Sequence, residues 1–217
     1  MRKNFDLHAN EYDDWYDKNM AVFESELSAI AGVLGSIQAN LRGIEIGVGS
    51  GRFASKLHLG YGLDPSTGML QLTRQRNINC VKAVAEKLPF RDETFDIILM
   101  VTVICFLDDV QQAFNEATRV LKDGGVIVLG MIDRNSHLGK AYEEKEKKKT
   151  SHMTMNFHTV DETLRYLHTA GLNEYGICQT LFRPLEEIVL AEPTIQGHGE
   201  GGFVVIAAGK DLKKKDE

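Results

Sequence analysis

The chain has 217 residues, a net charge of −6 at pH 7, and ordinary fractions of hydrophobic (43%) and charged (26%) residues. This length fits a single domain over 1–217 with a sizeable core, and because no apolar run could span a bilayer, we expect no membrane partner. The N-terminus lacks the apolar stretch of a signal peptide, which predicts a cytoplasmic protein, and the acidic balance argues against binding to nucleic acid.

Helices and strands alternate through the first half of the chain. Phe23, Leu27, Ile30 and Leu34 recur at helical spacing and predict an amphipathic helix over 21–38. After this helix we expect strands at about 43–47, 60–64, 79–84 and 95–101, with helices at 51–58 and 67–76 between them. The strand at 95–101 is an apolar run, as expected for a parallel strand buried on both faces.

The same alternation continues in the second half. The spacing from Val110 to Leu121 predicts a helix that Gly124-Gly125 ends, before a strand at 126–131. Thr159 and Glu162 form a capping box that opens another helix, which Gly171 closes. Two final strands are expected at 175–182 and 203–208. Alternating strands and helices predict an α/β fold with a parallel, doubly wound sheet.

The segment 44–52 is the most informative in the chain. An apolar strand carrying Glu45 leads into Gly47, Gly49 and Gly51. Because glycine has no Cβ, such a loop lets a mononucleotide-type cofactor lie against the main chain. It is not the NAD fingerprint G-x-G-x-x-G, because Arg52 stands where the third glycine belongs.

Two acids narrow the choice of cofactor. Glu45 lies beside the glycine loop, where a carboxylate repels phosphate and attracts an ammonium group; S-adenosylmethionine carries an ammonium group and no phosphate. Asp64 ends the next strand, where it can accept hydrogen bonds from ribose hydroxyls. The alternatives are a tight turn without a ligand for the glycines, and structural or helix-capping roles for the two acids.

Five ordered blocks, at 44–52, 61–66, 83–90, 95–99 and 120–125, resemble the class I S-adenosylmethionine-dependent methyltransferases, in particular the small-molecule type. The resemblance implies a Rossmann-like sheet of seven strands, mostly parallel with an antiparallel last strand. It also implies S-adenosyl-L-methionine as the cofactor, with S-adenosyl-L-homocysteine as its product. The residues that it assigns to cofactor binding are Glu45, Gly47, Gly49, Gly51, Asp64, Pro65, Met69, Ala85, Glu86 and Val101.

The adenine contacts depart from the family's pattern. Val84 stands where relatives often carry an acid for the adenine amino group, so Glu86 or a backbone carbonyl would have to substitute, while the Ala85 N–H could bond a ring nitrogen. Met69 is expected either at the adenine edge or as simple core. Backbone from Val101 and Thr102 should flank the sulfonium, unless Thr102 merely ends its strand.

Three segments lie outside the minimal core and should emerge at one rim of the sheet. Residues 1–20 resemble the leader of many relatives, through Phe5, Ala9, Tyr12, Asp13 and Trp15, and are expected to form a lid over the cofactor. Residues 132–158 are expected to form an inserted cap, and 183–202 to join them at the carboxyl ends of the strands. Residues 210–217 are expected to be a disordered tail.

The expected reaction is an SN2 methyl transfer to a small-molecule acceptor: an amine, a hydroxyl, a carboxylate or a carbon. Because in-line positioning does most of the work, no catalytic residue is assigned. Candidates to face the acceptor are Asp133, His137, Tyr142, His152 and His158, with plain surface residues as the commoner alternative. The alternative functions are a methyltransferase acting on a protein or RNA, and a catalytically silent cofactor-binding module. No Cys/His spacing indicates a metal, and the oligomeric state is open.

Overall fold

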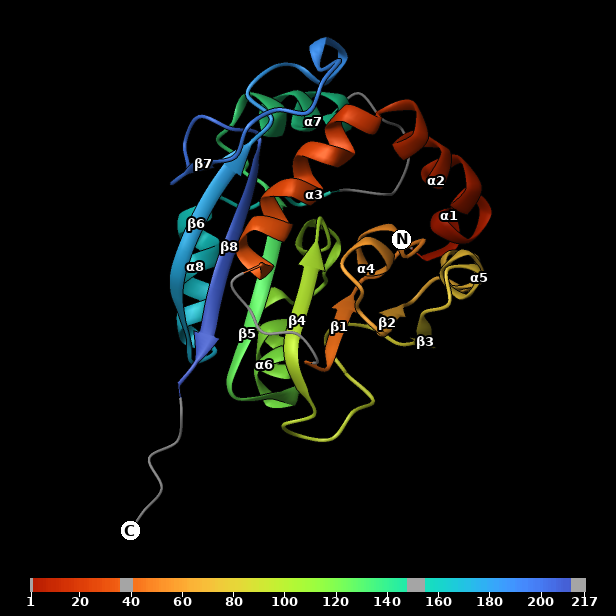
Figure 1. The fold of residues 1–217 in the computed structure, drawn as a ribbon, viewed down its shortest axis with the longest axis vertical. Helices are drawn as coiled ribbons and strands as arrows, with labels where there is room; N and C mark the ends of the chain where they lie inside the picture. The colour runs from red at the N-terminus through yellow and green to blue at the C-terminus, as the bar shows by residue number, and fades with distance from the viewer. Residues whose placement is uncertain (1, 36–40, 148–154, 212–217) are drawn as a thin grey trace.

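A mixed sheet forms the centre of the computed structural model, which describes residues 2–35, 41–147 and 155–211 (Figure 1). Its eight strands follow the order β3-β2-β1-β4-β5-β8-β6-β7. The strands are β1 (Gly43–Ile46), β2 (Tyr61–Asp64), β3 (Asn79–Lys82), β4 (Phe95–Val101), β5 (Leu121–Ile132), β6 (Leu172–Thr180), β7 (Ile195–Gln196) and β8 (Phe203–Lys210).

The sheet is doubly wound, as predicted. Strands β1 to β5 pair in parallel, and the strand order reverses between β1 and β4, which is the switch point where open α/β sheets bind ligands. The last strand, β8, inserts antiparallel between β5 and β6, which confirms the expected reversal. One strand was not predicted: β7 has only two residues, both exposed, and pairs with the edge of β6.

Helices cover both faces of the sheet (Figure 1). On one face, α3 (Met20–Leu34), α4 (Arg52–Lys56) and α5 (Thr67–Gln75) share an apolar cluster with Leu99 and Val205. On the other, α6 (Val110–Val120) and α8 (Val160–Thr169) share a second cluster with Ile98 and Val204. Neighbouring residues of β4 and β8 therefore enter opposite clusters, which explains why these central strands are apolar along their length.

The junction of α6 and β5 differs from the prediction. The helix ends at Val120, and Leu121 already pairs with Phe95 on β4, so Gly124-Gly125 lies inside β5 and does not end the helix. The pairing is irregular here, with a register shift between Phe95 and Ile97, and Gly124 has φ 73°. Leu121 is fully buried, so its side chain favours the earlier start of the strand.

Most remaining segments gather at the carboxyl ends of the parallel strands (Figure 1). They include α1 (Arg2–Leu7), α2 (Ala9–Lys18), η1 (Ile104–Phe106), α7 (His137–Lys147) and η2 (Leu185–Glu187). Of the expected cap, residues 148–154 lie outside the described residues, as do 212–217 of the expected tail; Lys210 still belongs to β8. Along the described chain, no helix combines the length and apolarity needed to cross a bilayer.

The capping box at Thr159 and Glu162 allows a test of α8. The Glu162 N–H donates to Thr159 Oγ1 at 3.1 Å, and the Thr159 N–H donates to Glu162 Oε2 at 2.9 Å. We expect Thr159→Ala to lower the free energy of unfolding by about 1 kcal/mol, measured by urea denaturation. Thr159→Ser keeps the hydroxyl and is the control; an equal loss in both variants would contradict the role of the cap.

Candidate functional site

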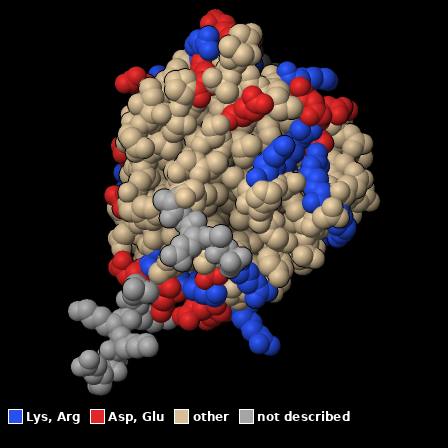
Figure 2. All heavy atoms as spheres, in the orientation of Figure 1, with Lys and Arg blue, Asp and Glu red and all other residues tan. Residues whose placement is uncertain are grey.

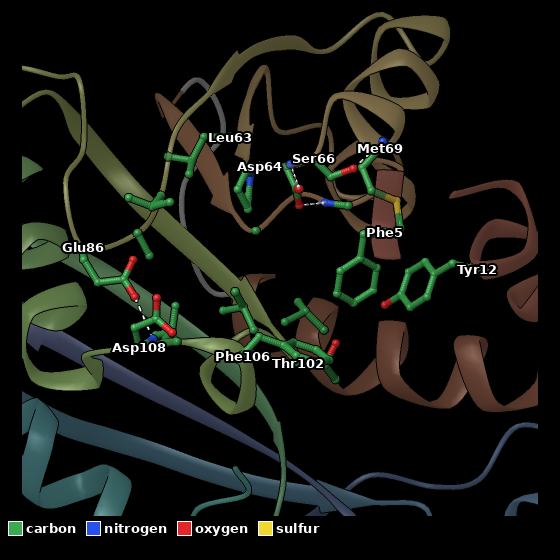
Figure 3. Close-up of a pocket in the computed structure, with 18 residues that line it drawn as sticks. Phe5, Tyr12, Leu63, Asp64, Ser66, Met69, Glu86, Thr102, Phe106 and Asp108 are labelled. Atoms are coloured by element: carbon green, nitrogen blue, oxygen red, sulfur yellow. Dashed lines mark hydrogen bonds between the residues drawn. The ribbon is translucent and has the colours of Figure 1, made fainter. Parts of the chain in front are cut away.

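A cavity opens at the switch point, between the carboxyl ends of β1, β2 and β4 (Figure 3). We call it the switch-point cavity. Its walls come from the glycine loop, the ends of β2 and β4, the segments after β3 and η1, and the N-terminal helices. Its lining residues are Phe5, Tyr12, Gly47, Gly49, Leu63, Asp64, Pro65, Ser66, Met69, Val84, Ala85, Glu86, Val101, Thr102, Val103, Phe106, Leu107 and Asp108.

The glycine loop turns sharply out of β1. The N–H groups of Gly47 and Val48 both donate to the Leu63 carbonyl at 2.9 Å, which fixes the loop to β2. Gly47 has φ 73°, and a Cβ there would collide with Val103, so only glycine fits this position. Gly51 lies outside the lining of the switch-point cavity: it has φ 85°, precedes α4 and packs against Thr73 and Ile78.

Glu45 occupies a recess beside this cavity, together with Tyr16, Gly47 and Phe53. The side chain is 2% exposed, and its Oε2 accepts a hydrogen bond from the Ala54 N–H at 2.8 Å. Burial raises the pKa of the Glu45 carboxyl well above its usual value, more than the bond from Ala54 lowers it. A cation in the recess would remove this penalty, because it favours the ionised form.

Asp64 is held in a fixed orientation at the end of β2. Its Oδ1 accepts from the Ser66 N–H at 2.8 Å and its Oδ2 accepts from the Gly49 N–H at 3.0 Å. Burial raises the pKa of this carboxyl, against the effect of both bonds. Each oxygen has a further lone pair, so the carboxylate can still accept hydrogen bonds from a ligand in the cavity.

The opposite wall carries Ala85 and Glu86, and Figure 3 shows Glu86 across the cavity from Phe5 and Tyr12. Glu86 Oε1 accepts from the Asp108 N–H at 3.0 Å, which ties this wall to the segment after η1. The structure thus brings most of the predicted cofactor residues to one cavity: Gly47, Gly49, Asp64, Pro65, Met69, Ala85, Glu86 and Val101. Glu45 lies in the adjoining recess, and Gly51 packs behind the loop.

Ion pairs fasten α2 beside the glycine loop. Asp13 accepts from Arg52 Nε at 2.6 Å and from an Arg76 guanidinium nitrogen at 2.9 Å, and Asp17 accepts from Arg52 at 2.7 Å. Burial opposes ionisation of Asp13, but hydrogen bonds from Arg52, Ser50 and Arg76 outweigh it and lower the Asp13 pKa to about 2. These contacts hold α2 where Tyr12 lines the switch-point cavity.

A second cavity of about 550 Å³ adjoins the first, and we call it the aromatic cavity. The two share Phe5, Tyr12, Thr102 and Phe106. Thr102 has φ 51°, which is unusual for a threonine, and its N–H donates to the Gly130 carbonyl at 2.8 Å. The full lining is Phe5, His8, Glu11, Tyr12, Trp15, Tyr16, Glu26, Thr102, Cys105, Phe106, Ile132, Tyr142, Met155 and Phe157.

Sequence reasoning missed Glu26, the most buried acid of this second cavity. It projects from α3, is 6% exposed, and makes no hydrogen bond or ion pair with any residue that the structure describes. Burial raises the pKa of its carboxyl to about 8. A signal was present in the sequence: Glu26 lies three residues after Phe23 and four before Ile30, on the apolar face of the predicted helix.

Only one candidate from 132–158 lines the aromatic cavity, namely Tyr142. Asp133, His137 and His158 do not line either cavity, and His152 lies outside the described residues. His158 is buried, and burial lowers its pKa, so it is a poor base in its present surroundings. Within the described ranges, no group of three His, Cys, Asp or Glu side chains could hold a metal ion.

The chain is similar in sequence and in fold to known proteins. Residues 44–129 match the family model of a methyltransferase domain. The fold matches a solved Thermotoga maritima structure, described as a SAM-dependent methyltransferase and possible histamine N-methyltransferase, at 40% identity and a TM-score of 0.90, over 97% of this chain and 100% of that one. The chain is also 40% identical over 206 residues to an uncharacterized Methanocaldococcus jannaschii protein, covering 95% and 98% of the two chains. It is 26% identical to a Marinomonas malonyl-[acyl-carrier protein] O-methyltransferase, covering 76% and 64%.

The ion pairs of Asp13 predict an acid-sensitive contribution to stability. The folded pKa of about 2 lies below the ordinary value of 3.8, so the contribution is complete above about pH 4 and is lost as the pH falls toward 2. We expect Asp13→Asn to lower the free energy of unfolding at pH 6 by about 1–2 kcal/mol, because partial exposure screens the pairs.

The measurement is urea denaturation at several pH values between about 6 and 3. The difference between the native protein and Asp13→Asn should shrink as the pH falls. Asp14→Asn is the matched control, because Asp14 is exposed on the same helix. A difference that stays constant with pH, or an equal loss in both variants, would show that the Asp13 charge does not hold α2.

Proposed function

The chain belongs to the S-adenosylmethionine-dependent methyltransferases, and we propose that it methylates a small-molecule acceptor bound in the aromatic cavity. The observation that carries the proposal is the meeting of the two cavities at Phe5, Tyr12, Thr102 and Phe106. A cofactor in the first cavity and an acceptor in the second would face each other across these side chains.

The residues of the switch-point cavity and of the recess beside it fit the cofactor. The buried Glu45 carboxyl, with a single backbone hydrogen bond, suits the ammonium group of its methionyl part. Asp64 presents spare lone pairs to the ribose hydroxyls. We assign adenine to the wall formed by Met69, Ala85 and Glu86. The rest of the cofactor would lie against Gly47, Gly49, Pro65 and Val101. Gly51 shapes the loop from behind.

When bound, the cofactor supplies a methyl group on a positively charged sulfur, which already makes that group reactive. The protein therefore has to orient the acceptor and exclude water. In this proposal residues 1–20 act as the lid, because Phe5 and Tyr12 line both cavities. Residues 132–158 act as the cap, because Ile132, Tyr142 and Phe157 line the aromatic cavity.

A small acceptor is favoured over a protein or RNA. The aromatic cavity is walled by side chains of α1, α2, α3, η1 and α7, which suits a compact molecule rather than a polymer. On the face shown in Figure 2, Lys and Arg are interspersed with Asp and Glu, and much of the surface is uncharged. The relatives' names do not select the acceptor atom, because one names a possible histamine N-methyltransferase and another a malonyl-[acyl-carrier protein] O-methyltransferase.

The first test is binding of S-adenosylmethionine and S-adenosylhomocysteine by calorimetry. We expect both to bind, and we expect Asp64→Ala to weaken binding by about 1–3 kcal/mol, because the ribose hydroxyls lose an ionised acceptor. Asp161→Asn, at an exposed position on α8, is the control and should leave the affinity unchanged. Absence of binding at about millimolar cofactor would reject the proposed function. Binding without methyl transfer to any small acceptor would favour the silent module.

A further inference from the structure

The lining of the aromatic cavity suits a positively charged ligand. Seven of its lining residues are aromatic: Phe5, Tyr12, Trp15, Tyr16, Phe106, Tyr142 and Phe157. The faces of aromatic rings carry partial negative charge and attract ammonium groups. The carboxyl groups on the wall belong to Glu11 and Glu26, and no Lys or Arg of the described chain lines the cavity. His8, which also lines it, is hydrogen-bonded to Glu11 at 3.0 Å.

Glu26 is the group in this cavity that lacks a protein partner. Buried carboxyl groups in folded proteins are paired or hydrogen-bonded, because desolvation without compensation is unfavourable. Glu26 is 94% buried, lines the cavity, and has no hydrogen bond or ion pair to the part of the chain that the structure describes. Its neighbour Ser25 is anchored to the Ala21 carbonyl and the Glu192 N–H, which keeps this turn of α3 in place.

The groups that face Glu26 do not satisfy it. Tyr12 and Tyr16 from α2 bond each other through their hydroxyls at 3.1 Å, and Tyr142 approaches from α7. Burial raises the pKa of Tyr12 and of Tyr142 to about 12 and raises that of Tyr16 well above its ordinary value, so all three stay neutral at physiological pH. Cys105 of η1, with a pKa that burial raises to about 12, is also neutral.

We propose that the acceptor is an amine, which the aromatic cavity binds as an ammonium ion and from which Glu26 accepts a proton. This inference rests on the proposed function and names its substrate class. Acceptors of other charge fit less well: a carboxylate would meet Glu26 with like charge, and a neutral alcohol would gain nothing from the rings' attraction for cations.

The ammonium ion gives one N–H proton to the Glu26 carboxylate, which frees the nitrogen lone pair. That pair forms the new N–C bond to the methyl group, while the C–S bond breaks and its electron pair stays on sulfur as a thioether. The product is the N-methylated ammonium ion. Glu26 returns its proton to solvent when the product leaves, so one proton is released in each turnover.

Binding of a permanently charged amine analogue tests the site without the reaction. The probe is benzyltrimethylammonium, titrated by calorimetry with and without S-adenosylhomocysteine. Because the pKa of free Glu26 is raised to about 8, the probe must displace a proton below that pH. Its affinity should therefore rise between about pH 6 and pH 9. Glu26→Gln retains His8, Glu11 and the tyrosines, and should remove that rise and weaken binding at pH 9 at least about tenfold.

A matched panel tests the substrate class: phenethylamine, 2-phenylethanol and 3-phenylpropionate, each assayed with radiolabelled S-adenosylmethionine. Methylation of the amine with at least about tenfold preference over the other two supports the proposal. Equal or better use of the alcohol or the acid overturns it. Glu24→Gln is the control, because Glu24 is exposed on the same helix; Glu26→Gln should lose amine methylation while its affinity for S-adenosylhomocysteine stays native.

Two further readouts separate the possible failures. Glu26→Met replaces the buried acid with an apolar side chain of similar size and should fold at least as stably, yet bind neither amine nor probe. If Glu26→Gln or Glu26→Met binds the probe as the native protein does, the role of Glu26 is wrong. If S-adenosylhomocysteine fails to bind, the proposed function falls, while the probe titration without it still decides whether Glu26 forms a cation site.

Discussion

The tight connection between β1 and α4 is the constraint on which the rest of the site depends. The Leu63 carbonyl accepts two successive N–H groups of the loop, and the Glu45 carboxyl accepts the N–H of Ala54 in α4. These bonds join β1, β2 and α4 within a few residues, and Val103 leaves no space for a side chain at Gly47. Backbone and acid are consequently fixed at the point where the strand order reverses, and the cavity forms above them.

Three buried acids surround the two cavities, and they differ in how well the protein satisfies them. Asp64 accepts two backbone N–H groups and Glu45 accepts one, whereas Glu26 accepts none from the described part of the chain. Each missing hydrogen bond leaves a carboxyl that a positively charged or hydrogen-bonding ligand can stabilise. The carboxyl group with the most protein hydrogen bonds is the one that we propose to meet a neutral ligand group. In our proposal the neutral ribose hydroxyls bind at Asp64, whereas the methionyl ammonium group binds at Glu45 and the ammonium group of the acceptor at Glu26.

Local patterns in the sequence predict the bounds of a helix or strand well where residues of that element alone determine them. The apolar run at 95–101 is a strand with the predicted bounds, and the capping box at Thr159 begins α8. The prediction fails where tertiary contacts decide. Gly124-Gly125 marks the end of a helix by rule, yet the helix already ends at Val120, and the buried Leu121 pairs with Phe95 of β4 before the glycines are reached.

The sequence likewise predicts the lining of one cavity of the candidate site better than that of the other. The lining of the switch-point cavity comes from short blocks that follow one another along the chain, so motif reading finds most of it. The aromatic cavity collects side chains from five helical segments and the residues around Phe157, and no local pattern brings these together. Glu26 shows the difficulty: its spacing within α3 predicts burial, but what it faces depends on how α2 and α7 pack.

Helix α2 contributes wall residues to both cavities. Tyr12 stands between the two cavities, on the same helix whose Asp13 is tied to Arg52 and Arg76. A displacement of α2 would therefore open the wall at Tyr12 in both cavities together. One helix thus forms part of the wall of both cavities. The ion pairs that hold α2 and the exposure of the two cavities are therefore coupled, because loosening Asp13 and Asp17 from the arginines would open both cavities at this wall.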